Sequence, residues 1–249
     1  MSDLLSSWAE APFTDGGLTR ATFRKGSGPG VIVIHEIPGI TPKVAAFAEE
    51  VVAAGFTVVM PSLVGTPGRE ISGGYGMSSM LKVCVAKEFT NWATGQTSPI
   101  IGWLQALART VHAECGGPGV GALGMCFSGG FALGMMVDPV VVAPVLSQPS
   151  LPFAAGKKRS ADLNLSPADL AVVRERVASG CEVLGLRFDQ DKLVGTRFDT
   201  LRRELGDGFL AVELPSATKR DHSVLTEQRD DASVQRVLAF FREKLLADN

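Results

Sequence analysis

The hydrophobic positions along this chain of 249 residues follow two alternating patterns. Short, continuous apolar runs rich in valine, isoleucine and leucine are typical of strands that are buried on both faces of a sheet. Between these runs, apolar residues recur every three or four positions, as they do on the buried face of a helix. The predicted strands cover residues 30–36, 56–61, 119–125, 140–147, 181–188 and 209–214, and the predicted helices cover residues 41–55, 97–115, 128–136, 166–180, 196–205 and 233–246.

This order of elements predicts the fold class. Strands that alternate with helices indicate an α/β protein with a mostly parallel sheet and helices on both faces. No linker or internal repeat divides the chain, so we expect one domain over residues 1–249. Two segments, residues 62–96 and 148–166, interrupt the alternation, and connections of this length are commonly lids or binding loops.

Composition narrows the class of function. Hydrophobic residues make up 45% of the chain and its formal net charge is −2, so no basic surface is expected to attract nucleic acid or anionic lipid. The N-terminal stretch MSDLLSSWAEAPFTDG lacks the apolar core of a signal peptide, and no stretch reaches the roughly 18 apolar residues of a membrane helix. The four cysteines are scattered without a C-x-x-C pair, which predicts reduced thiols, no metal site and a cytoplasmic protein.

Polar residues with catalytic chemistry follow several of the predicted strands. Ligands of parallel sheets bind beyond the carboxyl ends of the strands. A thiol, a carboxylate and an imidazole at that edge are the parts of a nucleophile–acid–base triad. The candidates, in chain order, are His35, Glu36, Cys126, Asp189, Asp191, Asp221 and His222.

The stretch GALGMCFSGG, residues 121–130, is the strongest local signal. A sharp strand-to-helix turn that exposes a nucleophile needs small residues two positions before and two positions after it. These are Gly124 and Ser128 if Cys126 attacks, or Cys126 and Gly130 if Ser128 attacks. We favour Cys126, because the strand pattern runs up to it and the following helix start would stabilise a thiolate. A buried structural cysteine is the alternative interpretation.

The three histidines differ in their positions. His222 lies between the last predicted strand and the last predicted helix, where an imidazole can reach the nucleophile turn. His35 ends the first predicted strand and is expected to neighbour the site. His112 lies on an ordinary helix and is expected to be structural or exposed.

Four stretches carry a resemblance to a known family. They are HEIPGI (35–40), GMCFSGG (124–130), LGLRFDQDKLV (184–194) and DHSVLT (221–226). In this order they resemble the dienelactone hydrolase family, a branch of the α/β-hydrolases that uses cysteine instead of serine. The resemblance implies an α/β-hydrolase fold and a carboxylic ester or lactone hydrolase of the carboxymethylenebutenolidase type, with no metal or organic cofactor.

The resemblance also assigns roles to residues. Cys126 would be the nucleophile and His222 the base, while the backbone amides of Phe127 and Ile37 would form the oxyanion hole. Glu36 matches a glutamate beside the thiol that in the family takes part in controlling the resting cysteine.

The triad acid has two candidates. The family places a valine three residues after the acid, and Val194 stands three residues after Asp191, which favours Asp191 over Asp189. Gly195 follows where the family usually has proline, and this departure weakens the match.

The substrate is less constrained by the sequence. Well-known members of the family hold a substrate carboxylate with arginines, and no such arginine can be assigned after His222. Residues of the first excursion that could bind an anion or line a pocket, with solvation or packing as the alternative, are Arg69, Tyr75, Lys82, Lys87 and Trp92. We expect a small-molecule ester or lactone substrate and a monomer or small homo-oligomer. Thioester or amide hydrolysis on the same triad and a non-catalytic binding protein on this scaffold are the other hypotheses.

Overall fold

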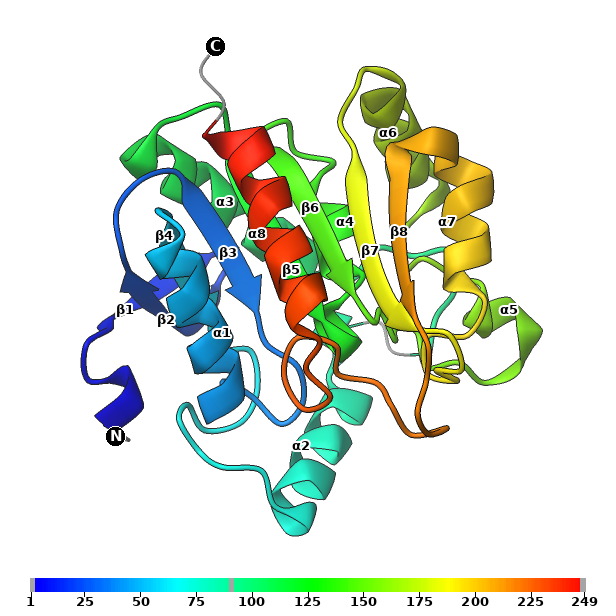
Figure 1. The fold of residues 1–249 in the computed structure, drawn as a ribbon, viewed down its shortest axis with the longest axis horizontal. Coiled ribbons are helices and arrows are strands. Elements are labelled where there is room, and N and C mark those ends of the chain that lie inside the picture. Colours follow the sequence, from blue (N-terminus) through cyan, green and yellow to red (C-terminus); the bar gives the residue numbers. More distant parts are fainter. Residues whose placement is uncertain (1–2, 90–91, 247–249) are drawn as a thin grey trace.

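The computed structural model describes residues 3–89 and 92–246 and is built around one eight-stranded sheet (Figure 1). The strands are β1 (Ala9–Asp15), β2 (Leu18–Lys25), β3 (Gly30–Ile34), β4 (Thr57–Pro61), β5 (Val120–Met125), β6 (Val141–Ser147), β7 (Val183–Phe188) and β8 (Phe209–Leu214). The α-helices are α1 (Pro42–Ala53), α2 (Gly73–Val85), α3 (Ile100–Cys115), α4 (Phe131–Met135), α5 (Gly156–Ser160), α6 (Pro167–Ala178), α7 (Arg197–Leu205) and α8 (Asp231–Leu245). Short 3₁₀ turns are η1 (Asp3–Leu5), η2 (Lys87–Phe89), η3 (Cys126–Ser128) and η4 (Gly206–Gly208).

The strand order is β1-β2-β4-β3-β5-β6-β7-β8, with β3 to β8 parallel to one another and β2 antiparallel to both of its neighbours, β1 and β4. From β3 the chain adds β4 on one side and then β5 on the other, so the order reverses between β3 and β5. A reversal of this kind leaves a crevice at the carboxyl ends of the two strands. Ile34 pairs with Gly124 in this register, so the residues that follow β3 and β5 leave the sheet side by side.

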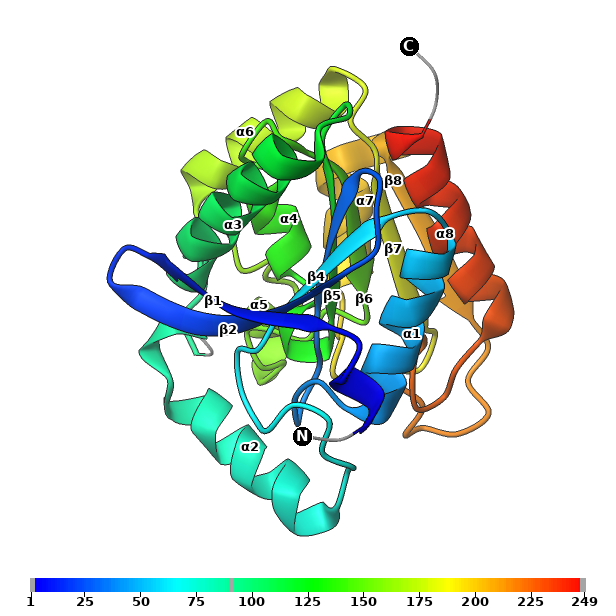
Figure 2. The same cartoon turned by 90° about the vertical axis from the view of Figure 1, so that its left-hand side faces the viewer.

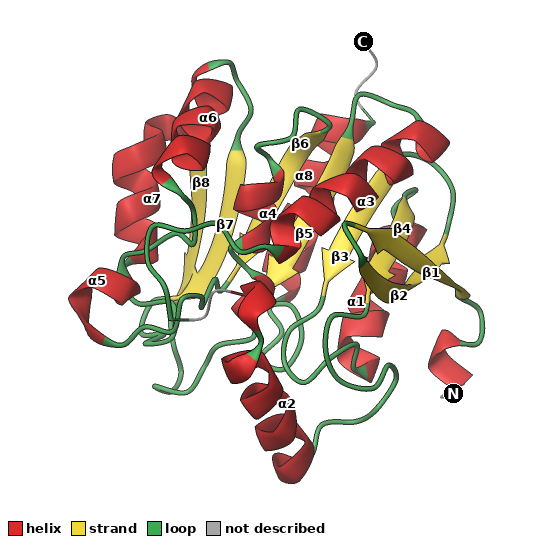
Figure 3. Cartoon of the chain, turned by 180° about the vertical axis from the view of Figure 1, so that it is seen from behind, coloured by secondary structure: helices red, strands yellow, loops and turns green. Residues whose placement is uncertain are grey.

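Two hydrophobic cores lie on opposite faces of the sheet. One contains buried side chains of α1 and α8, and the other contains those of α3, α4, α6 and α7 (Figures 1 and 3). In α1, Thr41 accepts a hydrogen bond from the backbone N–H of Val44 at 3.3 Å, and Pro42 occupies the first turn. Local capping and the apolar stripe thus agree, as the sequence pattern predicts.

The structure confirms the predicted strands and helices from residue 30 onward, with boundaries that shift by a few residues. It also contains elements that the pattern did not predict. The β1–β2 hairpin projects at one edge of the sheet (Figure 2), and β1 is mostly exposed, so it lacks the apolar run of a buried strand. The two excursions are not irregular throughout, because residues 62–96 contain α2 and residues 148–166 contain α5. Among the described residues, no helix is both long and apolar enough to cross a membrane.

Candidate active site

The turn after β5 has the geometry of a nucleophile elbow. Cys126 has a φ of 56°, a left-handed conformation that a non-glycine residue adopts only under constraint. A Cβ on Gly124 would lie 2.0 Å from the carbonyl oxygen of Ser128, and one on Gly129 would lie 2.6 Å from the Cα of Pro149. The small residues around Cys126 are therefore required by close backbone approach.

The structure changes one expectation about this elbow. The η3 turn follows β5 directly, but α4 begins only at Phe131 and is five residues long. Gly129 and Gly130 lie between the two, and glycine is a poor helix former. Cys126 thus lies at the start of a 3₁₀ turn rather than at the N-terminus of a longer helix, and the helix dipole contributes less to a thiolate there than the sequence suggested.

Ser128, the other candidate nucleophile, is fully buried. Its hydroxyl accepts a hydrogen bond from the Met125 N–H at 3.0 Å and faces three carbonyl oxygens, those of Met125 and His35 at 3.0 Å and that of Ile34 at 3.1 Å. The side chain thus ties the elbow to the end of β3, whereas Cys126 is partly exposed. The sequence pattern requires only a small residue at Ser128, but in the structure its hydroxyl also links the elbow to the end of β3.

His222 and Asp191 meet at the carboxyl edge of the sheet. The Nδ1 of His222 lies 2.6 Å from Oδ2 of Asp191, and the other carboxylate oxygen accepts the backbone N–H of Leu193 at 2.9 Å. Asp189 instead accepts the backbone N–H of Ser216 at 2.9 Å and makes no contact with His222. Of the two acid candidates, the structure brings only Asp191 to the imidazole.

His222 is also coupled to Cys126. Burial lowers the pKa of His222, but the charge of Cys126 and the hydrogen bond that His222 donates to Asp191 outweigh it, so this pKa is raised well above its usual 6.5. The Nε2 atom is buried and makes no hydrogen bond of ordinary geometry within the described residues. Catalytic hydrogen bonds are often long in unliganded enzymes. The imidazole therefore faces the thiol with one nitrogen and the carboxylate with the other.

Glu36 is buried beside this pair but faces the loop that carries His222. Its carboxylate accepts hydrogen bonds from the hydroxyls of Ser223, at 2.7 Å, and Thr226, and from the amide of Gln148 at 3.4 Å. Burial raises the pKa of Glu36, while these hydroxyls and the charge of His222 oppose the rise. Glu36 therefore holds the loop that carries His222 through these hydrogen bonds. The family resemblance did not specify this contact.

The two expected oxyanion donors follow adjacent strands. Ile37 lies three residues beyond β3, and Phe127 lies in η3 directly after β5. Within the described residues, the backbone N–H groups of Ile37 and Phe127 have no hydrogen-bond acceptor. Unpaired N–H groups at such a turn are available to an anionic oxygen.

The other two histidines have distinct environments. His35 is fully buried, and its ring contacts the Phe127 ring with centroids 5.8 Å apart. His112 lies near the C-terminal end of α3, the end that leads into the start of β5, and therefore at the opposite edge of the sheet from Cys126. His35 is near the site, and His112 is not.

Comparison with known proteins identifies the family of this chain. Residues 19–152, more than half of the chain, match the model of the dienelactone hydrolase family. The chain belongs to the dienelactone hydrolase family. The matched region includes Glu36 and the Cys126 elbow and ends before Asp191 and His222, which the fold brings to the same edge. No curated protein matches the sequence significantly.

Solved structures agree with this family membership. A dienelactone hydrolase from Anabaena variabilis is 16% identical with a TM-score of 0.64, covering 96% of this chain and 99% of its own. A dienelactone hydrolase-like promiscuous phosphotriesterase from metagenomic libraries is 18% identical with a TM-score of 0.64, covering 96% and 98%. A cold-adapted esterase from an Arctic intertidal metagenomic library is 15% identical with a TM-score of 0.63, covering 96% and 95%. The chain has the α/β-hydrolase fold that this family uses.

Sequence reasoning missed Arg197, which organises the loops of this dienelactone hydrolase family member. Arg197 is 1% exposed, and burial lowers its pKa to about 10. Its guanidinium donates to six backbone carbonyls, those of Leu151, Pro152, Arg159, Asp162, Leu193 and Val194. It therefore joins the turn after Asp191 to residues 148–166. An arginine in the first turn of a polar helix gave no signal of this role.

The basic and aromatic candidates of the first excursion are spread out. Arg69 stacks on the ring of Tyr75 at 4.3 Å, and the Tyr75 hydroxyl bonds to the backbone of Thr66. Trp92 packs against Phe153 with ring centroids 5.3 Å apart. Tyr75 thus packs from α2 and Trp92 from the turn after η2, and Lys87 is exposed on η2.

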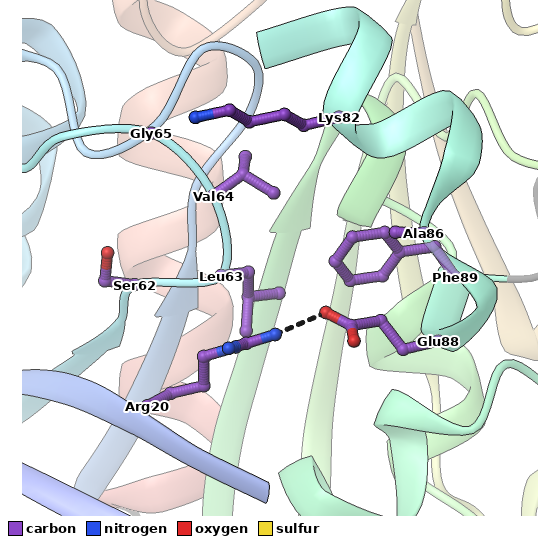
Figure 4. Close-up of a pocket in the computed structure, with 9 residues that line it drawn as sticks. All are labelled: Arg20, Ser62, Leu63, Val64, Gly65, Lys82, Ala86, Glu88 and Phe89. Carbon is purple, nitrogen blue, oxygen red and sulfur yellow. Dashed lines mark hydrogen bonds and ion pairs between the residues drawn. The ribbon is translucent and has the colours of Figure 1, made fainter.

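Lys82 reaches a cavity of about 450 Å³ beside the site (Figure 4). Arg20 and Glu88 form an ion pair at 2.6 Å in its wall. Its described lining residues are Arg20, Ser62, Leu63, Val64, Gly65, Lys82, Ala86, Glu88 and Phe89, a set that does not include Cys126. The Phe89 ring, which lines the cavity, packs against the Phe127 ring with centroids 5.5 Å apart.

Metal ligands do not gather at the site. Within residues 3–89 and 92–246, no three His, Cys, Asp or Glu side chains are grouped so as to hold a metal ion.

Proposed function

We propose that this protein hydrolyses a carboxylic ester or lactone through a Cys126–His222–Asp191 triad. The observation that carries the proposal is the position of His222. Its Nδ1 lies 2.6 Å from Oδ2 of Asp191, and the charge of Cys126 raises its pKa. An imidazole between a carboxylate and an elbow thiol is the arrangement of nucleophilic acyl transfer. Family membership and the positive φ of Cys126 support the same conclusion.

In the first half of the proposed reaction, His222 takes the thiol proton and the sulfur of Cys126 bonds to the substrate carbonyl carbon. The carbonyl oxygen becomes an oxyanion that accepts hydrogen bonds from the Phe127 and Ile37 amides. Removal of one such donor typically costs 10²–10³ in rate, or about 3 kcal/mol. The C–O bond then breaks, and the leaving alkoxide takes a proton from His222, which leaves a thioester.

In the second half, His222 takes a proton from water, and the hydroxide attacks the thioester carbonyl. The C–S bond breaks, the carboxylic acid is released and the thiolate of Cys126 returns beside the imidazolium of His222. In a lactone the alkoxide stays attached to the acyl group, so the product is a hydroxy acid. We propose a cytoplasmic location, because four scattered cysteines without a C-x-x-C pair suit a reducing compartment.

The test is hydrolysis of a short activated aryl ester by the wild type and by the matched variants Cys126→Ala and Ser128→Ala. We expect Cys126→Ala to lose turnover, and Ser128→Ala to keep a measurable rate with a lower melting temperature. Mass spectrometry after rapid acid quenching should find the acyl group on the Cys126 peptide.

The alternatives give different results in the same experiment. Turnover of thioesters or amides but not of esters or lactones would change the substrate class while keeping the triad. Equal residual rates in all three proteins would favour the non-catalytic binding protein. Loss of turnover in Ser128→Ala alone would move the nucleophile by two residues.

A further inference from the structure

His35 is held in one tautomer by its two neighbours. The backbone N–H of Leu63 donates to Nε2 of His35 at 3.0 Å, and that of Val64 lies at 3.4 Å. Because Nε2 accepts, it carries no proton, and the ring proton of the neutral imidazole is on Nδ1. Nδ1 lies 2.8 Å from the carbonyl oxygen of Glu36 and therefore donates to it. Burial lowers the pKa of His35 to about 4, which agrees with a neutral ring.

The carbonyl of Glu36 and the N–H of Ile37 belong to the same peptide unit. This unit is planar, and it is trans because the only cis bonds in the described chain precede Pro38 and Pro152. In a trans unit the C=O and N–H groups point in opposite directions. A hydrogen bond that fixes the carbonyl of Glu36 therefore also fixes the direction of the Ile37 N–H.

We propose that His35 is a positioning residue that orients the Glu36–Ile37 peptide so that its N–H serves the oxyanion hole. The ring of His35 also packs against Phe127, which supplies the other donor, and its backbone carbonyl faces the Ser128 hydroxyl. One buried side chain is thus in contact with both halves of the hole. This inference rests on the proposed ester hydrolysis.

Two substitutions separate the two hydrogen bonds of the ring. In His35→Asn, the amide nitrogen lies near the place of Nδ1 and can still donate to the Glu36 carbonyl. In His35→Gln, the amide oxygen lies near the place of Nε2 and can still accept from Leu63, but the donor to Glu36 is lost. Both variants remove the imidazole and its contact with Phe127 and place an amide there, and they differ by one methylene.

The readouts are ester hydrolysis and alkylation of Cys126 by iodoacetamide. Alkylation forms a C–S bond and releases iodide without an oxyanion, so it reports the thiol and His222 alone. We expect kcat for His35→Gln to fall roughly 10–100-fold with little change in KM, because loss of a whole donor costs 10²–10³. We expect His35→Asn to stay within about tenfold of the wild type, and the alkylation rates of all three proteins to agree within about threefold.

Several results would overturn the inference. Equal losses of kcat in the two variants would show that the donor to Glu36 is not what matters. A loss of alkylation as large as the loss of hydrolysis would place the damage at the thiol. If His35→Gln does not fold, His35→Asn decides alone, and a loss above about 100-fold in a folded protein contradicts the proposal. A wild type without ester turnover would instead refute the proposed function.

Discussion

The two halves of the candidate site are built in different ways. The nucleophile half, with Cys126 and the Ile37 amide, lies within three residues of the buried strands β5 and β3. In the acid–base half, Asp191 also stands three residues beyond its strand, β7, but His222 lies on a longer connection, eight residues beyond β8. The first half takes its geometry from the sheet, whereas the position of His222 in the second half must come from contacts of its loop.

The contacts of the second half span the chain. Glu36 accepts from Ser223 and Thr226, which are 187 and 190 residues away in the sequence. The side chain of Gln228 accepts the backbone N–H of His222 at 3.2 Å and that of Ser223 at 2.9 Å. A buried carboxylate and one amide thus hold a loop that has no strand or helix of its own. This comparison predicts different consequences for substitutions in the two halves.

The largest expected effect comes from breaking the acid–base half at its carboxylate. Asp191→Asn removes the charge that holds and stabilises the His222 imidazole, and kcat/KM for an aryl ester should fall about 10³–10⁴-fold. The matched control is Asp189→Asn, whose carboxylate contacts Ser216 instead, and its rate should stay within about threefold. Steady-state kinetics at neutral pH would check both. Comparable losses in the two variants would remove Asp191 from the triad.

Arg197→Met tests whether this buried side chain, which lies outside the triad, holds the loops around Asp191. The substitution leaves six carbonyls without their buried donor, and the free energy of unfolding should fall by about 4 kcal/mol. Denaturant unfolding would measure this, with the half-exposed Arg202→Met on the same helix as control, expected to change stability by less than about 1 kcal/mol. Hydrogen exchange should rise in residues 148–166 and 189–196. Equal loosening of residues 120–130 would contradict the division into two halves.

The same division explains which parts of the site could be predicted from the sequence. The elbow depends on neighbours in the chain, so the spacing of Gly124, Cys126 and Ser128 was enough to locate it. The carboxyl ends of parallel strands must share one edge, and this placed His222 and an aspartate with Cys126. The choice of Asp191 required the family spacing, which the structure supports with the 2.6 Å contact to His222.

Contacts that depend on tertiary packing could not be predicted in this way. The partners of Glu36 and Arg197 lie on loops far away in the sequence, and no periodicity marks a loop that will approach. The tautomer of His35 depends on the N–H of Leu63, a backbone group whose place is fixed by the path of the chain after β4. Similarly, β1 is an exposed edge strand, and it has no buried face to impose an apolar pattern.

The two histidines of the site, His35 and His222, are expected to change the stability of the protein with pH in opposite directions. The pKa of His35 is lowered to about 4, so its contribution to stability is complete above pH 6.5 and is lost as the pH falls toward 4. The loss corresponds to about 3 kcal/mol of folding free energy, because between these pH values the unfolded chain binds a proton at His35 and the folded protein does not. His222, with its raised pKa, has the opposite sign, since its contribution is complete below pH 6.5 and is lost as the pH rises through the folded value.

The measurement is denaturant unfolding of the wild type and of His35→Asn at pH 7 and pH 4. His222 and Glu36 titrate in both proteins, so the difference between the two pH dependences isolates His35. We expect the wild type to lose about 3 kcal/mol more than the variant over this interval. Parallel curves for the two proteins would mean that the buried ring is protonated without cost.

The smallest expected effect comes from alanine substitutions at two glycines of the elbow, Gly124 and Gly130. In Gly124→Ala the new Cβ would lie 2.0 Å from the Ser128 carbonyl oxygen, a backbone atom that can move only if the elbow opens. We expect a loss of about 2 kcal/mol in the free energy of unfolding, together with a fall in ester turnover as Cys126 shifts. In Gly130→Ala the nearest atom to the new Cβ is the Leu163 carbonyl oxygen at 3.7 Å, and the backbone is helical, so stability should stay within about 1 kcal/mol. Equal tolerance of both alanines would show that the elbow is held by its loops rather than by close packing on the sheet, and the contrast between the two halves of the site would then disappear.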